Sequence, residues 1–250
     1  MTITERYDRQ TSILPVEKLQ EISVLIVGVG AIGRPTALLT SATGFNTIGV
    51  CDPDTVEPHN LAAQGYKELD IGYHKVTCLA AEMHDTNSET YYKNFTRKFD
   101  ETMLDRVLDA SEVSYRDRKL VVISCVDSIE VRKEIWEAAS KHSNLGLFLD
   151  ARMSGPVIQV YGAQKGWTSF THYPTSLFSA EEAFSAPCSA RSMLYPCYIA
   201  AGMMVSQISN WIRGIPVEPY ISLNLNDMSD ISMEDRVVPT RLEEAVVSSG

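Results

Sequence analysis

The chain has 250 residues, 44% of them hydrophobic, and a formal net charge of −10. A chain of that length can bury one substantial core, so we expect a single domain over residues 1–250. The acidic balance argues against a protein that binds nucleic-acid phosphates, which normally carries a basic excess, and we expect the short basic runs at 96–98 and 116–119 to be solvated helix ends or loops.

The first predicted elements are an N-terminal helical arm and a strand–helix–strand unit. Within an arm of residues 1–20 we expect one or two short helices, the second opened by Pro15. An apolar run at 23–29 predicts a buried strand, and the helix that follows it is expected to close at Gly44. The next strand is predicted at 47–52, which completes one βαβ unit.

The rest of the chain continues the alternation of helices and strands. We expect a helix over 73–84, a strand over 119–127, a helix over 128–142, a strand over 145–151, an antiparallel strand over 156–164, a long apolar helix over 192–214 and a late strand over 219–227. The stretch 165–188 reads as an irregular loop, and 227–250 as a poorly ordered tail. This order predicts an α/β fold with a Rossmann-like, doubly wound, mostly parallel sheet and an antiparallel C-terminal extension.

A glycine fingerprint follows the first strand, at Gly28, Gly30 and Gly33. The first glycine permits a tight turn, the second lets the backbone approach a phosphate, and the third allows the helix to pack closely. Asp52 ends the second strand, where an acid binds a ribose hydroxyl. This pattern fits NAD and ATP equally, so the glycines alone do not identify the ligand.

Further motifs separate these ligands. They are Asp52-x-Asp54-x-Val56, Asn60-Leu61-x-x-Gln64, Asp70-Ile71-Gly72-x-x-Lys75, the opening run Arg6 to Gln10, and the run Cys125 to Arg132. In this order they resemble the ThiF/MoeB/HesA and ubiquitin-activating-enzyme superfamily. Because the paired Cys-x-x-Cys zinc motifs of many relatives are absent, the chain resembles a zinc-free member.

The resemblance implies an ATP-dependent adenylyltransferase. In that superfamily a carboxylate, usually the C-terminal glycine of a ubiquitin-like or sulfur-carrier protein, attacks the α-phosphate of ATP and releases pyrophosphate. The reaction needs cations that screen the approach of a carboxylate to a polyphosphate. The resemblance also implies a homodimer that needs ATP and Mg²⁺, without zinc. The lack of a signal-like or membrane-spanning apolar stretch and of closely paired cysteines predicts a soluble, cytoplasmic protein without a membrane partner, and the acidic charge argues against nucleic acid as a partner.

The same resemblance assigns residues to roles. Gly28, Gly30, Gly33, Asp52, Asp54, Asn60, Gln64 and Lys75 would bind the nucleotide, Asp127 would hold Mg²⁺, and Arg9 would reach the phosphates from the partner subunit. Without the resemblance, Lys75 reads as a solvated lysine at a helix start and Asp127 as a helix N-cap.

The sequence departs from the superfamily pattern at one charged position. Ala63 stands where an arginine would neutralise triphosphate charge, and the lost contact would cost about 1.5–3 kcal/mol. Arg34 and Arg132 are the candidate replacements. Arg34 reads equally as a solvated or packing residue, and Arg132 reads more readily as a helix-surface residue than as a ligand. The loss leaves open a nonadenylating subunit that binds partners through the same fold.

Cys188 is a candidate nucleophile by the same resemblance. Relatives carry a cysteine at the end of a crossover loop, here 165–188, and that cysteine forms a thioester or persulfide with the ubiquitin-like or sulfur-carrier protein. Arg191 and the following helix N-terminus would favour its thiolate, and the alternative is a small residue in a loop. The other cysteines, Cys51, Cys78, Cys125 and Cys197, are expected to pack in the core.

Two other enzymatic readings remain. One is the superfamily branch that adenylates a tRNA-bound carboxylate to drive dehydration, which the acidic charge disfavours. The other is an NAD-dependent oxidoreductase, which shares the glycine fingerprint.

Overall fold

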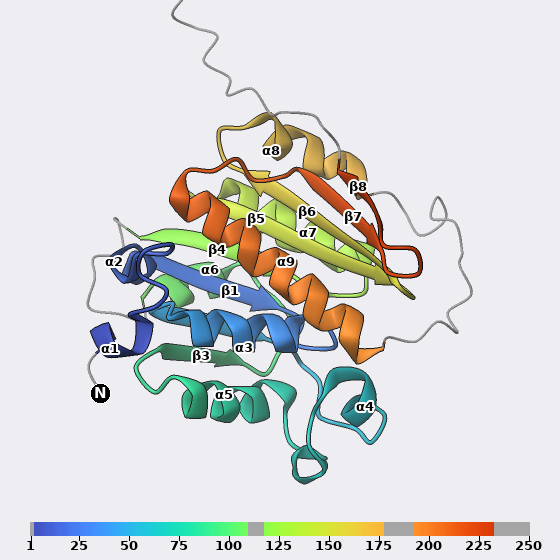
Figure 1. Ribbon diagram of the computed structural model, residues 1–250. Helices are drawn as coiled ribbons and strands as arrows, with labels where there is room; N and C mark the ends of the chain where they lie inside the picture. The colour runs from blue at the N-terminus through green and yellow to red at the C-terminus, as the bar shows by residue number, and fades with distance from the viewer. Residues whose placement is uncertain (1–2, 110–117, 178–192, 233–250) are drawn as a thin grey trace, which may run out of the picture.

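The computed structural model describes residues 3–109, 118–177 and 193–232 (Figure 1). Its strands are β1 (Ile22–Val27), β2 (Thr47–Cys51), β3 (Tyr91–Phe95), β4 (Lys119–Ser124), β5 (Leu145–Ser154), β6 (Val157–Gln164), β7 (Tyr220–Asn224) and β8 (Ser229–Ser232). Its α-helices are α1 (Ile3–Tyr7), α2 (Val16–Gln20), α3 (Gly33–Thr43), α4 (Asn60–Gln64), α5 (Lys75–Thr86), α6 (Thr102–Leu108), α7 (Ile129–Lys141), α8 (Thr168–His172) and α9 (Leu194–Arg213), and short 3₁₀ turns are η1 (Glu68–Asp70) and η3 (Tyr173–Ser176).

The strands form one eight-stranded sheet in the order β3-β2-β1-β4-β5-β6-β7-β8. The pairs from β3 through β5 are parallel, and β6, β7 and β8 each pair antiparallel with their neighbours. The predicted fold class, a doubly wound and mostly parallel sheet with an antiparallel extension, is therefore confirmed.

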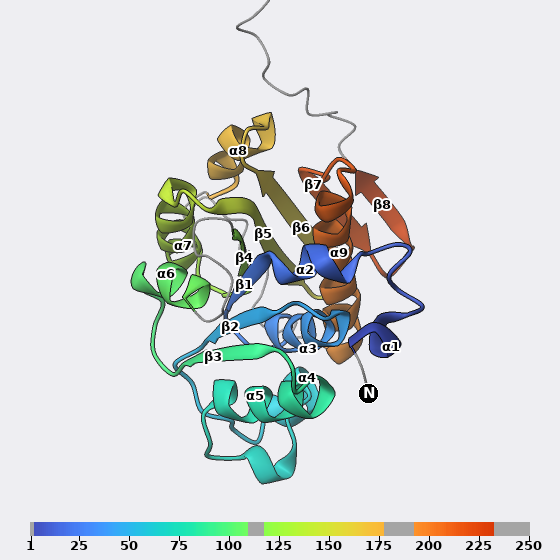
Figure 2. The ribbon, with the colours of Figure 1, turned by 90° about the vertical axis from the view of Figure 1, so that its left-hand side faces the viewer.

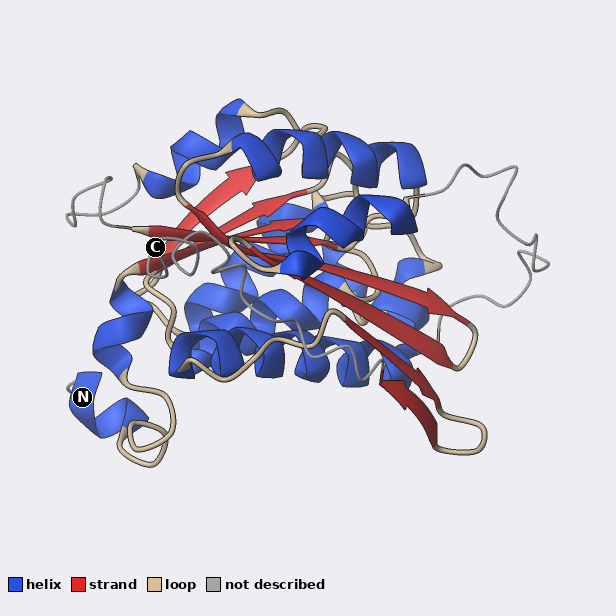
Figure 3. Ribbon diagram, turned by 90° about the horizontal axis from the view of Figure 1, so that it is seen from above, coloured by secondary structure: helices blue, strands red, loops and turns tan. Residues whose placement is uncertain are grey.

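Helices cover both faces of the sheet (Figures 2 and 3). Helices α3, α5 and α9 pack on one face over one apolar cluster, and α6, α7 and α8 pack on the other over a second. Strand β1 is buried along its whole length, which explains its apolar sequence, and its one polar residue is Ser23. Helix α3 ends, as predicted, at Gly44, whose φ of 101° is the left-handed conformation of a helix C-cap.

Some elements differ from the prediction. Strand β3 and helix α6 were not expected, because β3 is an edge strand with only one buried residue and so lacks an apolar run. The segment expected as an irregular loop begins with α8 and η3, which pack against the sheet through Tyr173. The segment expected as a tail contributes β8, which pairs with β7.

Arg118 corrects the expectation that the run 116–119 is solvated. Its side chain is buried and donates to the hydroxyls of Ser23 and Thr47, at 3.0 and 2.9 Å. Cys188, Arg191 and residues 233–250, which carry other predictions, lie outside the described residues. No helix in the part of the chain that is described is long and apolar enough to cross a membrane.

Candidate functional site

A cavity of about 820 Å³ opens at the carboxyl ends of the parallel strands. Its wall comes from the turn after β1, the ends of β2, β4 and β5, the starts of α4, α5 and α7, and the segment after β3. The volume falls within the range of pockets for small molecules and cofactors, roughly 300–1,000 Å³. In a sheet of this topology, ligands bind at this edge.

The glycine turn forms the floor of the cavity. A Cβ on Gly28, whose φ is 85°, would lie 2.8 Å from the carbonyl oxygen of Cys125, and one on Gly33 would lie 1.8 Å from the carbonyl oxygen of Gly28. A Cβ on Gly30 would meet only Gln64, at an ordinary 3.7 Å. The fold itself therefore requires the outer glycines, whereas Gly30 keeps the floor open to a ligand that approaches the backbone.

Asp52 joins the end of β2 to the glycine turn. Its buried carboxylate accepts hydrogen bonds from the backbone N–H groups of Val29 and Asp54, both at 2.9 Å. These bonds fix the carboxylate at the edge of the cavity, where its remaining lone pairs can accept from a ligand hydroxyl.

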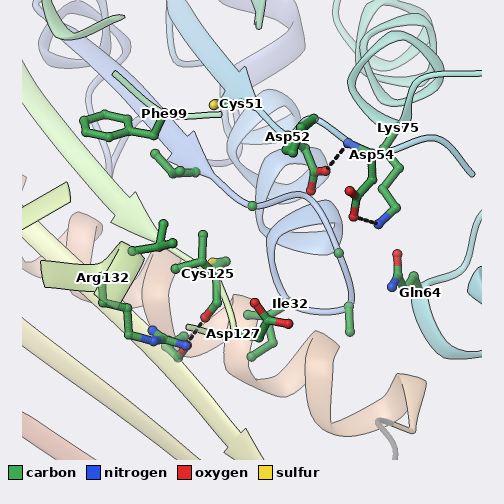
Figure 4. Close-up of a pocket in the computed structure, with 18 of the residues that line it drawn as sticks. Ile32, Cys51, Asp52, Asp54, Gln64, Lys75, Phe99, Cys125, Asp127 and Arg132 are labelled. Carbon is green, nitrogen blue, oxygen red and sulfur yellow. Dashed lines mark hydrogen bonds and ion pairs between the residues drawn. The ribbon is translucent and has the colours of Figure 1, made fainter. Parts of the chain in front are cut away.

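Lys75 lies at the start of α5, and its side chain is only 7% exposed. Its ammonium donates to the carboxylate of Asp54 at 2.9 Å, as Figure 4 shows. Asp54 is 63% exposed, so the pair has one buried and one solvated partner. The reading of Lys75 as a solvated lysine is wrong.

Asp127 follows β4 and lines the cavity beside the glycine turn. The N-cap of α7 is the next residue, Ser128, whose hydroxyl accepts from the N–H of Val131 at 3.2 Å. The alternative reading of Asp127 as that N-cap is therefore wrong, and its exposed carboxylate faces the cavity.

The described residues contain no group of three or more His, Cys, Asp or Glu side chains placed to hold a metal ion. Mg²⁺ in nucleotide sites is usually held by one or two carboxylates together with phosphates and water. Asp127 would be the one protein carboxylate of such a set, so the residues present fit Mg²⁺ bound together with a nucleotide.

Helix α4 brings Asn60 and Gln64 to the cavity. The side-chain oxygen of Asn60 accepts from the N–H of Glu57 at 2.8 Å, which closes the turn before the helix. The Gln64 oxygen is buried without a hydrogen-bond partner among the described residues. Ala63 does not line the cavity, although its neighbours in the motif do.

Arg34 does not face the cavity. Its guanidinium donates to Glu82 at 2.6 Å and lies over the Tyr66 ring at 5.2 Å. The side chain is buried and does not line the cavity, so the expectation that Arg34 replaces the missing arginine finds no support in its position.

Arg132 does line the cavity, from the first turns of α7. Its guanidinium forms an ion pair with Asp150 and donates to the backbone carbonyls of Val126 and Ala151, the latter at 3.2 Å. Burial, together with the charge of nearby Arg152, lowers the pKa of Arg132 to about 10, so the side chain stays charged at neutral pH.

Arg9 lies at the far end of α3 from the cavity. Two side chains of the N-terminal arm that carries Arg9 make hydrogen bonds there. Gln10 donates to the backbone carbonyl of Thr43 at 2.7 Å, and Arg6 donates to the backbone carbonyl of Thr86 at 2.6 Å. Those carbonyls end α3 and α5, whereas the cavity lies at the starts of these helices. Since α3 alone is about 16 Å long at 1.5 Å per residue, Arg9 does not reach the cavity of its own chain.

The described cysteines lie in or beside the core, as expected. Cys51 and Cys197 are buried, while Cys78 and Cys125 are half-buried. Burial raises the pKa of Cys51 and of Cys125 to about 12, so both are thiols at neutral pH. Both also line the cavity, which the sequence did not indicate.

Several lining residues were missed by sequence reasoning. Lys98 and Phe99 follow β3, a strand that was not expected, and Glu134 lies in the second turn of α7. The signal for Lys98 and Phe99 was positional: in a parallel sheet, residues directly after a strand gather at the same edge.

Curated proteins with related sequences include "Adenylyltransferase and sulfurtransferase MOCS3" from Dictyostelium discoideum, 38% identical over 135 residues that cover 49% of this chain and 32% of that protein. "Ubiquitin-like modifier-activating enzyme 5" from Drosophila simulans is 31% identical over 146 residues, which cover 56% of this chain and 35% of that protein. The matched regions therefore span about a third of each relative.

The fold is similar to that of E. coli MccB in its crystal structure with ATP, with a TM-score of 0.66 and 18% identity over 91% of this chain and 70% of that one. At that identity the likeness concerns the fold. The ThiF family model matches residues 7–245. The chain belongs to the ThiF family, as the resemblance of its motifs predicted.

Proposed function

We propose that this chain binds ATP in the cavity and transfers AMP to the C-terminal carboxylate of a peptide or small ubiquitin-like protein. A carboxylate oxygen attacks the α-phosphorus, the bond from that phosphorus to the bridging oxygen breaks, and pyrophosphate leaves with the electron pair. The observation that carries the proposal is the convergence of Asp52, Lys75 and Asp127 on one cavity above an open glycine turn, in a ThiF-family chain.

In this proposal, each of these groups contacts a different part of the nucleotide. Asp52 would accept from a ribose hydroxyl, as its position at the end of β2 favours. The open floor at Gly30 and the N-terminus of α3 would receive the phosphates. Lys75 is a buried cation that lines the same cavity, and binding would exchange its partner Asp54 for a phosphate oxygen.

Charge in the cavity favours additional cations. The lining carboxylates are Asp52, Asp54, Asp127 and Glu134, and the lining bases are Lys75, Lys98 and Arg132. This set does not neutralise a bound triphosphate. Mg²⁺ held by Asp127 would supply positive charge at the phosphates when bound.

Arg9 supports a homodimer as the working form. Its own cavity is out of reach, so a role for Arg9 at the phosphates requires a second copy of the chain that places its arm over the first copy's site. Such a guanidinium would stabilise charge on the leaving pyrophosphate.

The adenylate could have either of two fates. It could pass directly to an acceptor, or the Cys188 thiolate could attack the acyl carbon and expel AMP to form a thioester. Replacement of Cys188 by Ser separates them, because a reducible carrier adduct lost in that variant supports the thioester and an unchanged adduct removes it.

One observation favours a second candidate, a nonadenylating subunit that binds partners. Ala63 removes a phosphate ligand of the superfamily pattern, and Arg34, the nearest candidate replacement in sequence, is held by Glu82. Such a subunit would bind its partner without ATP turnover.

Pyrophosphate release from ATP tests both candidates. The candidate carriers are small proteins that end in Gly-Gly and are encoded nearby. Release would be measured for the parent protein and for the variants Lys75→Ala and Asp127→Ala. The matched controls are Lys133→Ala and Glu137→Ala, which replace exposed residues of α7. Release that depends on a carrier and falls only in the first two variants supports adenylation. Absence of ATP binding with every carrier contradicts it, and full activity in Asp127→Ala would show that the metal assignment is wrong.

A further inference from the structure

A buried carboxylate lies within β5, opposite Ser124, the last residue of β4. Asp150 is completely buried, and none of the motifs of the nucleotide site includes it. Its carboxylate pairs with Arg132 on one side and with Arg152 on the other, where the N–H of the Arg152 Nε lies 2.9 Å away. The hydroxyl of Tyr173 donates to the same carboxylate at 3.0 Å.

The buried carboxylate of Asp150 has three side-chain partners. A buried charge needs partners that compensate for lost hydration, and Asp150 has two guanidinium groups and a phenol. Burial raises the pKa of Tyr173 to about 12, so that hydroxyl keeps its proton and remains a donor. The cluster therefore carries a net positive charge next to the cavity wall.

Arg132 connects the cluster to the turn that carries Asp127. Besides Asp150, its guanidinium binds the carbonyl of Val126, the residue immediately before Asp127, and the carbonyl of Ala151. Figure 4 shows Arg132 beside Cys125 and Asp127, with a dashed line to the backbone of this turn. The turn is thereby tied to β5 through one side chain whose direction Asp150 fixes.

We propose that Asp150 is a positioning residue, which holds Arg132 so that the Val126–Asp127 turn keeps the Asp127 carboxylate directed into the cavity. The inference rests on the proposed function, since Asp127 matters for turnover only if the cavity carries out adenylation. Asp150 itself does not line the cavity, so its proposed effect is indirect, through Arg132.

Arg152, the other arginine of the cluster, binds a different segment, the 3₁₀ turn η3. Arg152 donates to the backbone oxygen and the hydroxyl of Ser176, at 2.9 and 3.0 Å, and lies over the Tyr161 ring at 4.3 Å. Asp150 thus fixes both α7 and η3 against β5, and a test must separate its effect on Asp127 from general support of the fold.

Two substitutions probe the positioning role. Asp150→Asn keeps the size of the side chain but leaves Arg132 without its anionic partner. Arg132→Lys keeps the positive charge and therefore the buried ion pair. A lysine ammonium lacks the planar guanidinium, so it cannot bind Asp150 and two carbonyls with the same geometry. The second variant keeps the proposal testable if the first folds poorly. Glu137→Gln, an exposed acid on α7, is the matched control.

The decisive activity measurement is a double-mutant cycle with Asp127→Ala. Each variant is expected to lower kcat for pyrophosphate release by about tenfold or more, with KM for ATP changed less than about threefold. In the Asp127→Ala background the same substitutions should cause no further loss, because no carboxylate remains to be positioned. Equal losses with and without Asp127 would overturn the proposal and leave Asp150 a structural residue.

Amide hydrogen exchange gives a readout that needs no activity. Peptides covering residues 125–128 should exchange faster in Asp150→Asn and Arg132→Lys than in the parent protein. In Glu137→Gln their exchange rate should be unchanged. Unchanged exchange in both folded variants would overturn the inference even if adenylation is correct. Faster exchange without any pyrophosphate release in the parent protein would support the positioning and refute the proposed function.

Discussion

Lys75 carries the buried positive charge on which the proposed phosphate contact depends. Its ammonium is 2.9 Å from a carboxylate that is mostly solvated, so the pair can open toward a ligand without burying an unpaired acid. A buried amine with an exposed partner suits a group that exchanges one anion for another.

Replacement of Lys75 by Met tests this residue. Loss of a charge-assisted contact costs about 1.5–3 kcal/mol, so we expect kcat/KM for ATP to fall about 10- to 150-fold. Asp54→Asn, which removes the competing partner, should lower activity far less. Steady-state pyrophosphate release checks both variants, and an equal fall in the two would mean that the ion pair itself, and not a phosphate contact, is what matters.

Ala63 offers a gain-of-function prediction. Ala63→Arg restores the arginine of the superfamily pattern on α4, next to cavity residues Asn60 and Gln64. A new guanidinium–phosphate contact should tighten ATP binding by about tenfold or more. Calorimetric titration with ATP measures it, with Ala62→Arg on the same helix as control. Equal affinities in all three proteins would show that α4 does not face the phosphates.

The cysteines of the cavity wall give a pH prediction. Burial raises the pKa of Cys51 and Cys125 to about 12, above that of a free thiol, so their thiolate is nearly absent at neutral pH. Alkylation at pH 7.5 should be about a thousandfold slower than in the unfolded chain and rise about tenfold per pH unit toward the pKa. Mass spectrometry after timed iodoacetamide labelling measures it. Labelling of either cysteine at the unfolded rate would contradict the buried placement.

At the scale of elements, we expect two glycines of the turn after β1 to have different roles, Gly28 in stability and Gly30 in ATP binding. Gly28→Ala forces a Cβ to within 2.8 Å of a backbone oxygen at a positive φ, so we expect about 2 kcal/mol or more of lost stability and a fall in Tm of about 4–8 °C. Gly30→Ala meets only ordinary contacts and should keep its Tm within about 2 °C while losing about tenfold in ATP affinity. Thermal unfolding and ATP titration of both variants check this. A large fall in Tm for Gly30→Ala would contradict the open floor.

The elements could be predicted where both faces of a strand or one face of a helix are buried. Strands β1, β2 and β4 and helices α3 and α7 show this pattern and lie close to their expected bounds. Strand β3, with a single buried residue, and the short α6 gave no comparable signal. The turn η3 is fixed by long-range contacts of Tyr173 with Trp136 and Phe148. Such contacts depend on the assembled sheet, which sequence periodicity does not describe.

At the scale of the whole molecule, the topology brings residues of separate motifs to one cavity. Asp52, Lys75 and Asp127 are far apart in sequence and meet because β2 and β4 flank β1. Lys98 and Phe99 could not be foreseen without β3, and Asp150 could not be foreseen because only the packing of α7 on β5 gives it Arg132 as a partner. The role of Arg9 remains a prediction, since its own chain keeps it away from the cavity.

Subunit complementation tests the homodimer. In a mixed dimer of Arg9→Ala and Lys75→Ala chains, one site combines an intact Lys75 with the partner's intact Arg9. Random pairing of equal amounts should then restore about a quarter of wild-type activity, although each variant alone is nearly inactive. Co-expression with two affinity tags allows the mixed dimer to be purified. No recovery in purified mixed dimers would contradict an Arg9 that acts across subunits.

Exchange of labelled pyrophosphate into ATP tests the central claim most directly, because only reversible attack at the α-phosphate transfers that label. We predict that the chain catalyses this exchange when a protein or peptide with a free C-terminal carboxylate is present, and that Asp127→Ala and Lys75→Met abolish most of it. ATP binding without exchange for every carboxylate substrate, or exchange undiminished in both variants, would contradict the assignment of this cavity as an adenylation site.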